Sequence, residues 1–160
     1  MQVAIFARAI TYAETKDAKV AEAAFTAGLL HDIGKLVLAA NVPEMYGTVR
    51  RLELSKKISQ REAEVIVLGT THAQLGACLL GKWGLPLPIL EAIAWHHEPE
   101  RCTDKGFSML AAVHAANAFA QEGSEDAVHH RIKLEFLLRI GLGDCRNRWR
   151  EVCGIPAQKD

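Results

Sequence analysis

The sequence predicts an all-α fold, a compact bundle of many helices. Apolar residues recur with the helical period of about 3.6 residues along nearly every segment, and no segment shows the sustained alternation of a strand. Capping residues, glycines and prolines separate these periodic segments from one another. A chain of 160 residues is also long enough to bury a substantial core within one domain.

Local signals place the individual helices. Asp17 suits an N-cap, Pro43 suits the first turn of a helix, and Ser59 with Glu62 forms a capping box. We expect Gly34 to break or bend the helix that precedes it. The predicted helices cover 3–14, 17–29, 36–40, 43–56, 60–82, a segment that follows 84–88, an alanine-rich segment at 107–121, and two segments within 126–153.

Composition argues against several classes of function. Acidic and basic residues number 19 each, so no net charge attracts nucleic acid or an anionic membrane. No apolar run approaches the roughly 18–20 residues of a membrane span, and the N-terminus lacks the pattern of a signal peptide. The four cysteines form no C-x-x-C pair, as is typical of reduced cysteines. We therefore expect a cytoplasmic domain with no nucleic-acid or membrane partner.

Polar residues inside apolar runs form the candidate site. The stretch AGLLHDIGKLVLAAN places His31 and Asp32 where an unpaired charge would be costly. His72 lies in a second apolar run, and His96 and His97 end a third. Imidazole and carboxylate groups are ligands for Zn, Mn, Fe or Ni, so three helical segments could direct five such groups at one ion.

Other polar residues have simpler interpretations. Lys35 lies one turn after the first histidine and could face an anion such as a phosphate, although a surface lysine is the plainer interpretation. A single buried histidine is more often a hydrogen-bonded core residue than a ligand, and His114 is interpreted in this way. Glu64 is interpreted as a solvated helix residue, and His129 and His130 as exposed residues.

Three stretches carry a resemblance when they are taken together. They are AFTAGLLHDIGKLVLAAN, EVIVLGTTHAQLGACLLGKWGLPLPILEAIAWHHEP and LAAVHAANAFA. They resemble the HDOD domain, a divergent branch of the HD metal-dependent phosphohydrolase superfamily, over about residues 7–120. The motif H-D-I-G-K alone indicates only the superfamily, whereas THAQLGA, WGLP and HHEP in this order are far more specific.

The resemblance implies an HD-like helical fold with a buried polar or metal centre, of a kind found in bacterial signalling proteins. Carried over residue by residue, the implied metal ligands are His31, Asp32, His72, His96 and His97. The HH pair matches a ligand pair of the HD-GYP branch, which hydrolyses cyclic di-GMP with metal-activated water. If the chain were active, Asp32 and Lys35 would be the catalytic residues.

Departures from the superfamily pattern count against catalysis. No histidine precedes His31, where the superfamily has its first ligand, and no G-Y-P follows HHEP. The closing aspartate of the superfamily matches Asn117, which is a neutral and weaker ligand, so this ligand position is degenerate. We expect residues 1–123 to form the HDOD core without the N-terminal half of the family domain, and 124–160 to be a helical extension packed on that core.

The preferred hypothesis is a non-catalytic bacterial signalling or interaction domain with a degenerate metal or ligand site. The alternative is a metal-dependent phosphohydrolase for nucleotides or cyclic dinucleotides, and a third interpretation gives the histidines only capping and hydrogen-bonding roles. A divalent ion of Fe, Mn, Ni, Zn or Mg would be the cofactor, or the site would hold none. Expected partners are other signalling proteins or domains, a nucleotide or phosphate ligand, and a second copy of the chain.

Overall fold

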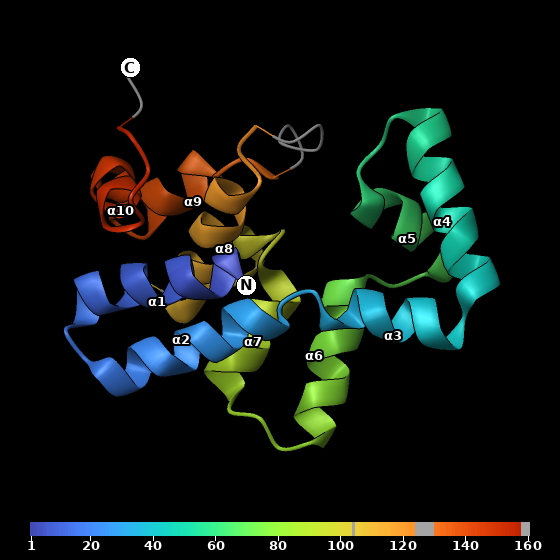
Figure 1. Ribbon diagram of the computed structural model, residues 1–160, viewed down its shortest axis with the longest axis horizontal. Coiled ribbons are helices and arrows are strands. Elements are labelled where there is room, and N and C mark those ends of the chain that lie inside the picture. The colour runs from blue at the N-terminus through green and yellow to red at the C-terminus, as the bar shows by residue number, and fades with distance from the viewer. Residues whose placement is uncertain (104, 124–129, 158–160) are drawn as a thin grey trace.

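The described residues form helices and connecting turns without a strand, so the predicted all-α fold is confirmed (Figure 1). The computed structural model describes residues 1–103, 105–123 and 130–157. Its helices are α1 (Gln2–Thr15), α2 (Ala18–Leu30), α3 (Ile33–Asn41), α4 (Pro43–Lys56), α5 (Gln60–Leu68), α6 (His72–Lys82), α7 (Leu87–Trp95), η1 (Pro99–Arg101), α8 (Met109–Ala120), α9 (Leu134–Arg139), η3 (Gly143–Cys145) and α10 (Arg146–Val152).

Small residues build the main bundle, in which α8 packs against α1, α2 and α7. Ten of the twelve residues of α8 are buried, because its run of alanines leaves room for neighbours on all sides. Gly28 allows a similar approach of α2 to α1, since a Cβ there would lie 2.8 Å from Ala4 Cα. The predicted N-cap of α2 is confirmed, because the Asp17 side chain accepts the backbone N–H groups of Lys19 and Val20.

The helix predicted over 60–82 is wrong, because α5 and α6 meet there at a bend of 72°. Gly69 ends α5 at φ 70°, in the left-handed region where a side chain would be strained. Thr71 then caps α6, since its hydroxyl accepts the Gln74 N–H at 3.2 Å. His72 is therefore the first residue of a helix rather than the middle of one.

The expectation that Gly34 breaks a helix is also wrong, because Gly34 lies within α3 and the break falls before Ile33. A Cβ on Gly34 would lie 1.9 Å from the carbonyl oxygen of His72. Gly76 serves the same contact, since a Cβ there would lie 3.1 Å from Ile33 Cγ2. These two glycines let α3 and α6 pack backbone to backbone, which brings Asp32 close to His72.

The helices α3, α4 and α5 form an arm that joins the main bundle through α6 (Figure 1). At the opposite side of the molecule, α10 packs on α1. Trp149 of α10 is fully buried, and its indole N–H donates to Glu14 Oε1 at 2.6 Å. The domain boundary predicted near residue 123 stays a prediction.

One stretch has the length and hydropathy of a membrane span, although the sequence analysis expected none. Ala18–Asn41, which covers α2 and α3, comprises 24 residues with a mean hydropathy of 1.3. The bent pair of α5 and α6 passes the same test when it is taken as one segment. Core helices of soluble proteins have these properties too, and Ala24 and Ala27 of α2 are fully buried in the core. The expected absence of a membrane partner stays a prediction.

Candidate metal centre

The first site residues lie in the short turn between α2 and α3. His31 is buried, and its Nδ1–H donates to the carbonyl oxygen of Gly28 at 2.8 Å. Asp32 holds the N-cap position of α3, yet its carboxylate caps no backbone N–H in the described helix. Instead its Oδ2 accepts a hydrogen bond from Lys35 Nζ at 2.8 Å and lies 3.5 Å from His31 Nε2. The turn thus presents a carboxylate and an imidazole side by side.

Glu64 orients the next ligand candidate, His72. Its carboxylate accepts the backbone N–H of His72 at 2.9 Å and the ring Nδ1–H at 2.7 Å. Gln60 Nε2 donates to the same carboxylate at 2.9 Å. Glu64 is fully buried, so its interpretation as a solvated residue is wrong. Glu64 precedes His72 by eight residues, and only the bend between α5 and α6 brings the two side chains into contact.

His96 and His97 follow directly after α7. His96 is 1% exposed, and its Nδ1–H donates to the Ile93 carbonyl at 2.8 Å. His97 Nε2 lies 3.3 Å from His72 Nε2. The next residue, Glu98, forms ion pairs with Arg61 of α5 and with Arg101, and these pairs tie the end of α7 to the arm. His96 and His97 therefore point into the site, whereas the Glu98 carboxylate points toward the two arginines that hold it.

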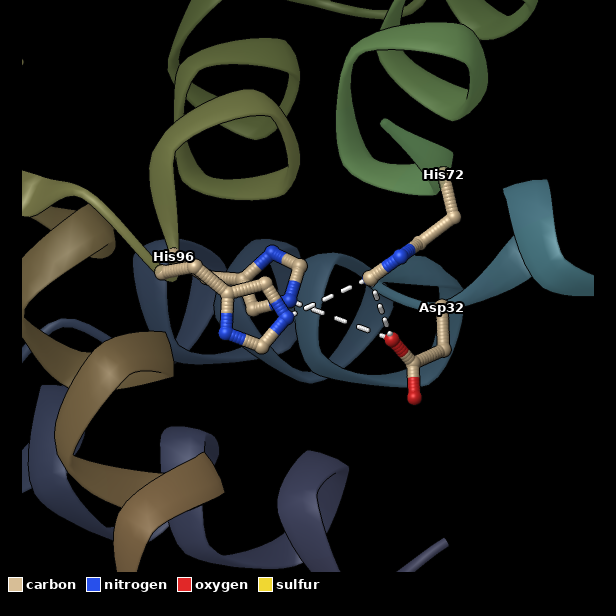
Figure 2. Close-up of side chains that lie close together, drawn as sticks. Asp32, His72 and His96 are labelled. Carbon is tan, nitrogen blue, oxygen red and sulfur yellow. Dashed lines mark hydrogen bonds and ion pairs between the residues drawn. The ribbon is translucent and has the colours of Figure 1, made fainter. Parts of the chain in front are cut away.

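These residues converge. One ligand atom from each of Asp32, His72, His96 and His97 lies within 4.8 Å of the other three. Figure 2 shows three of them directed at one another from the α2–α3 turn, the start of α6 and the end of α7. Asp32 Oδ1 lies 3.2 Å from His72 Nε2 and 3.8 Å from His96 Nε2. Ligands at about 2.1 Å from one tetrahedral ion would be about 3.4 Å apart, so this spacing fits a single small ion.

The hydrogen bonds of three histidines direct their Nε2 atoms toward the inside of the cluster. The Nδ1–H groups of His31, His72 and His96 all donate outward, to two backbone carbonyls and the Glu64 carboxylate. A neutral imidazole with a protonated Nδ1 has a lone pair on Nε2. Among the described residues, Asp32 Oδ1 and His96 Nε2 are buried without a hydrogen-bond partner. A proton between Asp32 and His72 would leave His96 Nε2 unsatisfied, whereas a cation would engage all the inner atoms.

Burial and charge shift the pKa values of the site in different directions. Desolvation lowers the pKa of His31, and desolvation together with neighbouring imidazoles lowers the pKa values of His96 and His97 well below their usual range. Burial also opposes protonation of His72, but hydrogen bonds with two carboxylates raise its pKa. Burial alone would raise the pKa of Asp32, yet a hydrogen bond with His72 and the proximity of His31, Lys35 and His96 lower it overall. An ionised carboxylate beside mostly neutral imidazoles is the protonation pattern of a metal site.

His114 is the hydrogen-bonded core histidine that the sequence analysis expected. Its Nδ1–H donates to the backbone oxygen of His96 at 2.8 Å, and its Nε2 accepts the Lys133 N–H at 2.9 Å. Both ring nitrogens of His114 thus form hydrogen bonds with backbone groups. Burial lowers the pKa of His114 to about 4. His114 therefore fixes the backbone at His96 and is not itself a member of the cluster.

Asn117 and His130 lie beside the cluster. Asn117, the predicted degenerate ligand position, is buried, and its Nδ2 lies 3.3 Å from His130 Nδ1. The ring centroid of His130 lies 5.3 Å from that of His97, and the residue is half-buried. The expectation of an exposed His130 is therefore wrong, because the chain before α9 returns to the site. His129 lies outside the described residues.

A cavity of about 250 Å³ opens beside the cluster. Its basic lining residues include Lys35, Arg61, His72, His97, His130 and Lys133. The carboxylates of Glu53 and Glu62 also line it, but Glu53 pairs with Arg50 and Glu62 closes the capping box with Ser59. The cations Lys35, Arg61 and Lys133 are paired as well, with Asp32, Glu98 and Glu100, so the cavity is lined by polar groups of both signs.

The family model of the HDOD domain matches residues 1–99 of the chain. The chain belongs to the HDOD family. Among solved structures, an HDOD domain protein with unknown function from Geobacter sulfurreducens superimposes with a TM-score of 0.71 at 23% identity, covering 89% of this chain and 50% of that one. A proposed phosphohydrolase from Shewanella amazonensis SB2B has a TM-score of 0.62 at 21% identity, covering 98% of this chain and 54% of that one. Both structures share the helical fold of this HDOD domain.

Relatives in sequence are longer proteins. An uncharacterised protein of Treponema pallidum is 28% identical over 112 residues, which are 70% of this HDOD chain and 22% of that protein. Ribonuclease Y of Thermus thermophilus is 29% identical over 117 residues, which are 72% of this chain and 16% of the enzyme. The chain therefore spans less than a quarter of the length of these curated relatives.

Proposed function

We propose that this HDOD domain binds a divalent transition-metal ion and acts as a non-catalytic binding module in bacterial signal transduction. One observation carries the metal proposal. Three imidazoles donate their Nδ1–H groups outward, and this directs their Nε2 atoms toward the Asp32 carboxylate. Asp32, His72, His96 and His97 would hold the ion, with His31 beside them.

The chemistry of the donor set favours some ions over others. Imidazole nitrogen suits Zn, Fe, Mn or Ni, whereas Mg²⁺ prefers an all-oxygen environment and octahedral waters. A set of three or four imidazoles with one carboxylate therefore argues for a transition metal. When bound, such an ion would act as a Lewis acid toward a phosphoryl oxygen or a water molecule.

Two features support a binding role without turnover. The superfamily's closing carboxylate is replaced by Asn117, whose amide is engaged with His130 rather than with Asp32. Lys35, the remaining candidate for contact with a substrate, is ion-paired with Asp32 at 2.8 Å. The cavity, with Lys35, Arg61 and Lys133 in its lining, would take a phosphate-bearing ligand or an acidic segment of another signalling protein. The cytoplasmic location and the homodimer stay predictions.

A metal-dependent phosphohydrolase is the second candidate. The specific observation in its favour is the cavity of about 250 Å³, which gives a ligand access to His72 and His97. The similarity to Ribonuclease Y and to a proposed phosphohydrolase points in the same direction.

Metal content tests the main proposal. Protein purified without added metal is analysed by inductively coupled plasma mass spectrometry, beside the double variant His96→Ala/His97→Ala and the variant Asp32→Asn. We expect about one transition-metal ion per chain in the wild type and little in either variant. Asp144→Asn, an exposed change of the same kind, is the matched control and should keep the ion. Wild-type protein that takes up no ion even from excess Zn, Mn, Fe or Ni would refute the proposal.

Turnover separates the two candidates. The loaded protein is incubated with generic phosphodiesters, nucleotides and cyclic dinucleotides in the presence of Mn, Fe or Ni. We expect no release of product above the level of the Asp32→Asn variant. Release that requires Asp32 and Lys35 would establish the phosphohydrolase instead.

A further inference from the structure

The contact between Asn117 and His130 determines which nitrogen of His130 carries its proton. The Asn117 Nδ2 is an amide nitrogen, which donates hydrogen bonds and cannot accept them. It lies 3.3 Å from Nδ1 of His130, so this ring nitrogen must be the acceptor. A neutral imidazole with an unprotonated Nδ1 carries its proton on Nε2.

This arrangement is the reverse of that in the cluster. His31, His72 and His96 are protonated on Nδ1 and direct lone pairs inward. His130, in contrast, has an N–H group at Nε2. The residues around the cavity therefore include acceptors suited to a cation and, in His130, a donor suited to an anion.

We propose that His130 donates a hydrogen bond from Nε2 to a phosphate-type oxyanion in the cavity, and that Asn117 sets the tautomer for this role. His130 lines the cavity together with Lys35 and Lys133, and its ring packs on His97. The Lys133 ammonium pairs with Glu100 at 2.6 Å, so His130 adds a neutral donor beside cations that are already partly compensated. This inference deepens the proposed function, on which it rests for the role of the cavity.

The proposal also gives Asn117 a different role from that of a degenerate metal ligand. A carboxylate at position 117 would accept a hydrogen bond from an Nδ1–H group of His130, and the neutral ring would then have a lone pair on Nε2. It would also add a negative charge beside the cavity. An amide avoids both effects, so Asn117 is a positioning residue for anion binding rather than a weakened metal ligand.

The tautomer is measured directly by long-range ¹H–¹⁵N NMR on the labelled full chain at pH 8. The His130 signals are assigned by their loss in His130→Gln. We expect a protonated Nε2 and an unprotonated Nδ1. A protonated Nδ1 would overturn the proposal, because the Asn117 amide would then face His130 with its oxygen.

Binding of inorganic phosphate gives the second measurement, by calorimetry on metal-free and metal-loaded protein. Removing one hydrogen bond to a charged oxygen should weaken binding about tenfold in His130→Ala. His130→Gln keeps an N–H near the position of Nε2 and should restore most of the affinity. Asn117→Asp should weaken binding at least as much as His130→Ala, because it reverses the tautomer and adds a charge.

Asn41→Asp is the matched control, since it adds the same charge at the exposed end of α3 and should leave phosphate affinity unchanged. Equal phosphate affinity in the wild type and His130→Ala, or an equal loss in Asn41→Asp, would also overturn the inference. Failure of the metal proposal has a different signature, because metal content would be absent while the His130 tautomer and phosphate binding to metal-free protein would persist.

Discussion

At the residue scale, Glu64 determines how His72 is presented to the cluster. A single buried carboxylate accepts both the backbone N–H and the ring Nδ1–H of His72. We expect Glu64→Gln to weaken metal binding about 10- to 100-fold, because the amide has one acceptor oxygen and no charge to raise the basicity of Nε2. Competition with a chromophoric chelator measures the change in affinity.

The matched control is Glu62→Gln in the same helix. Glutamine is compatible with the capping box that Glu62 forms with Ser59, so folding and metal affinity should both stay close to wild type. If Glu64→Gln binds the ion as tightly as Glu62→Gln does, Glu64 is a structural residue only.

His114 predicts a pH dependence of stability. Its pKa is about 4 in the folded chain and 6.5 in the reference state, so below pH 6.5 the unfolded chain binds the proton more readily. The contribution of a neutral His114 is therefore complete above pH 6.5 and is lost as the pH falls toward 4. A difference of this size corresponds to about 3 kcal/mol.

Urea unfolding of metal-free protein between pH 7 and pH 4 tests this expectation. His114→Gln should be less stable at pH 7, because it cannot hold both backbone groups, but its stability should fall less steeply with acid. The difference between the two curves isolates His114 from the other histidines. Parallel curves would show that His114 does not titrate in this range.

Sequence reasoning located five residues that the structure brings together, because adjacent polar pairs stand out in apolar runs. It missed Glu64 and His130 for a physical reason. Glu64 reaches the site only because the chain bends at Gly69, and His130 reaches it only because the chain before α9 returns to the cluster. Gly69 and Thr71 are local signals of a helix end and a helix start, but the apolar periodicity runs through them, and the return of the chain before α9 leaves no local pattern.

At the element scale, the contact between α3 and α6 depends on Gly34. A Cβ there would lie 1.9 Å from the His72 carbonyl oxygen. Since both atoms belong to or are fixed by the backbone, this clash can be relieved only if the two helices move apart. We expect Gly34→Ala to lower the free energy of unfolding by about 1–3 kcal/mol, and to weaken metal binding, because α6 must shift away from Asp32. Urea unfolding and chelator competition measure the two effects.

Gly47 provides the opposite case within helix α4. A Cβ on Gly47 would meet no described atom within 4 Å. Gly47→Ala should therefore raise the free energy of unfolding by about 0.5–1 kcal/mol through helix propensity alone. Should Gly34→Ala behave like Gly47→Ala, the close approach of α3 and α6 is not required.

The helices themselves were largely predictable, since caps and apolar periodicity are local properties. The Asp17 cap, the capping box at Ser59 and the start of α4 at Pro43 are all confirmed. The bend between α5 and α6 was not predicted, because the apolar pattern continues through Gly69 into the next helix. Periodicity reports which face is apolar and says nothing of a change in axis direction.

At the scale of the whole molecule, the cluster joins the arm of α3–α5 to the main bundle. An ion bound to the α2–α3 turn, to the start of α6 and to the end of α7 would stabilise the folded chain by mass action. We expect about 2.7 kcal/mol at a free metal concentration of 100 times Kd. This corresponds to a rise in Tm of roughly 5–10 °C.

Thermal unfolding with and without a chelator measures this effect. Asp32→Asn should show a smaller rise, because it removes the charged ligand while leaving the helices in place. Identical Tm values for wild-type protein in metal and in chelator would argue against an ion at this position.

Every residue of the cluster lies at a helix boundary, and this placement constrains how the chain can change in length. The direction of His96 depends on where α7 stops, because one residue inserted within that helix would rotate the side chain by about 100°. An insertion in the exposed turn at Lys57, between α4 and α5, would rotate none of the ligands. Insertions and deletions among relatives that keep this site should therefore concentrate in the α4–α5 turn and spare α6 and α7.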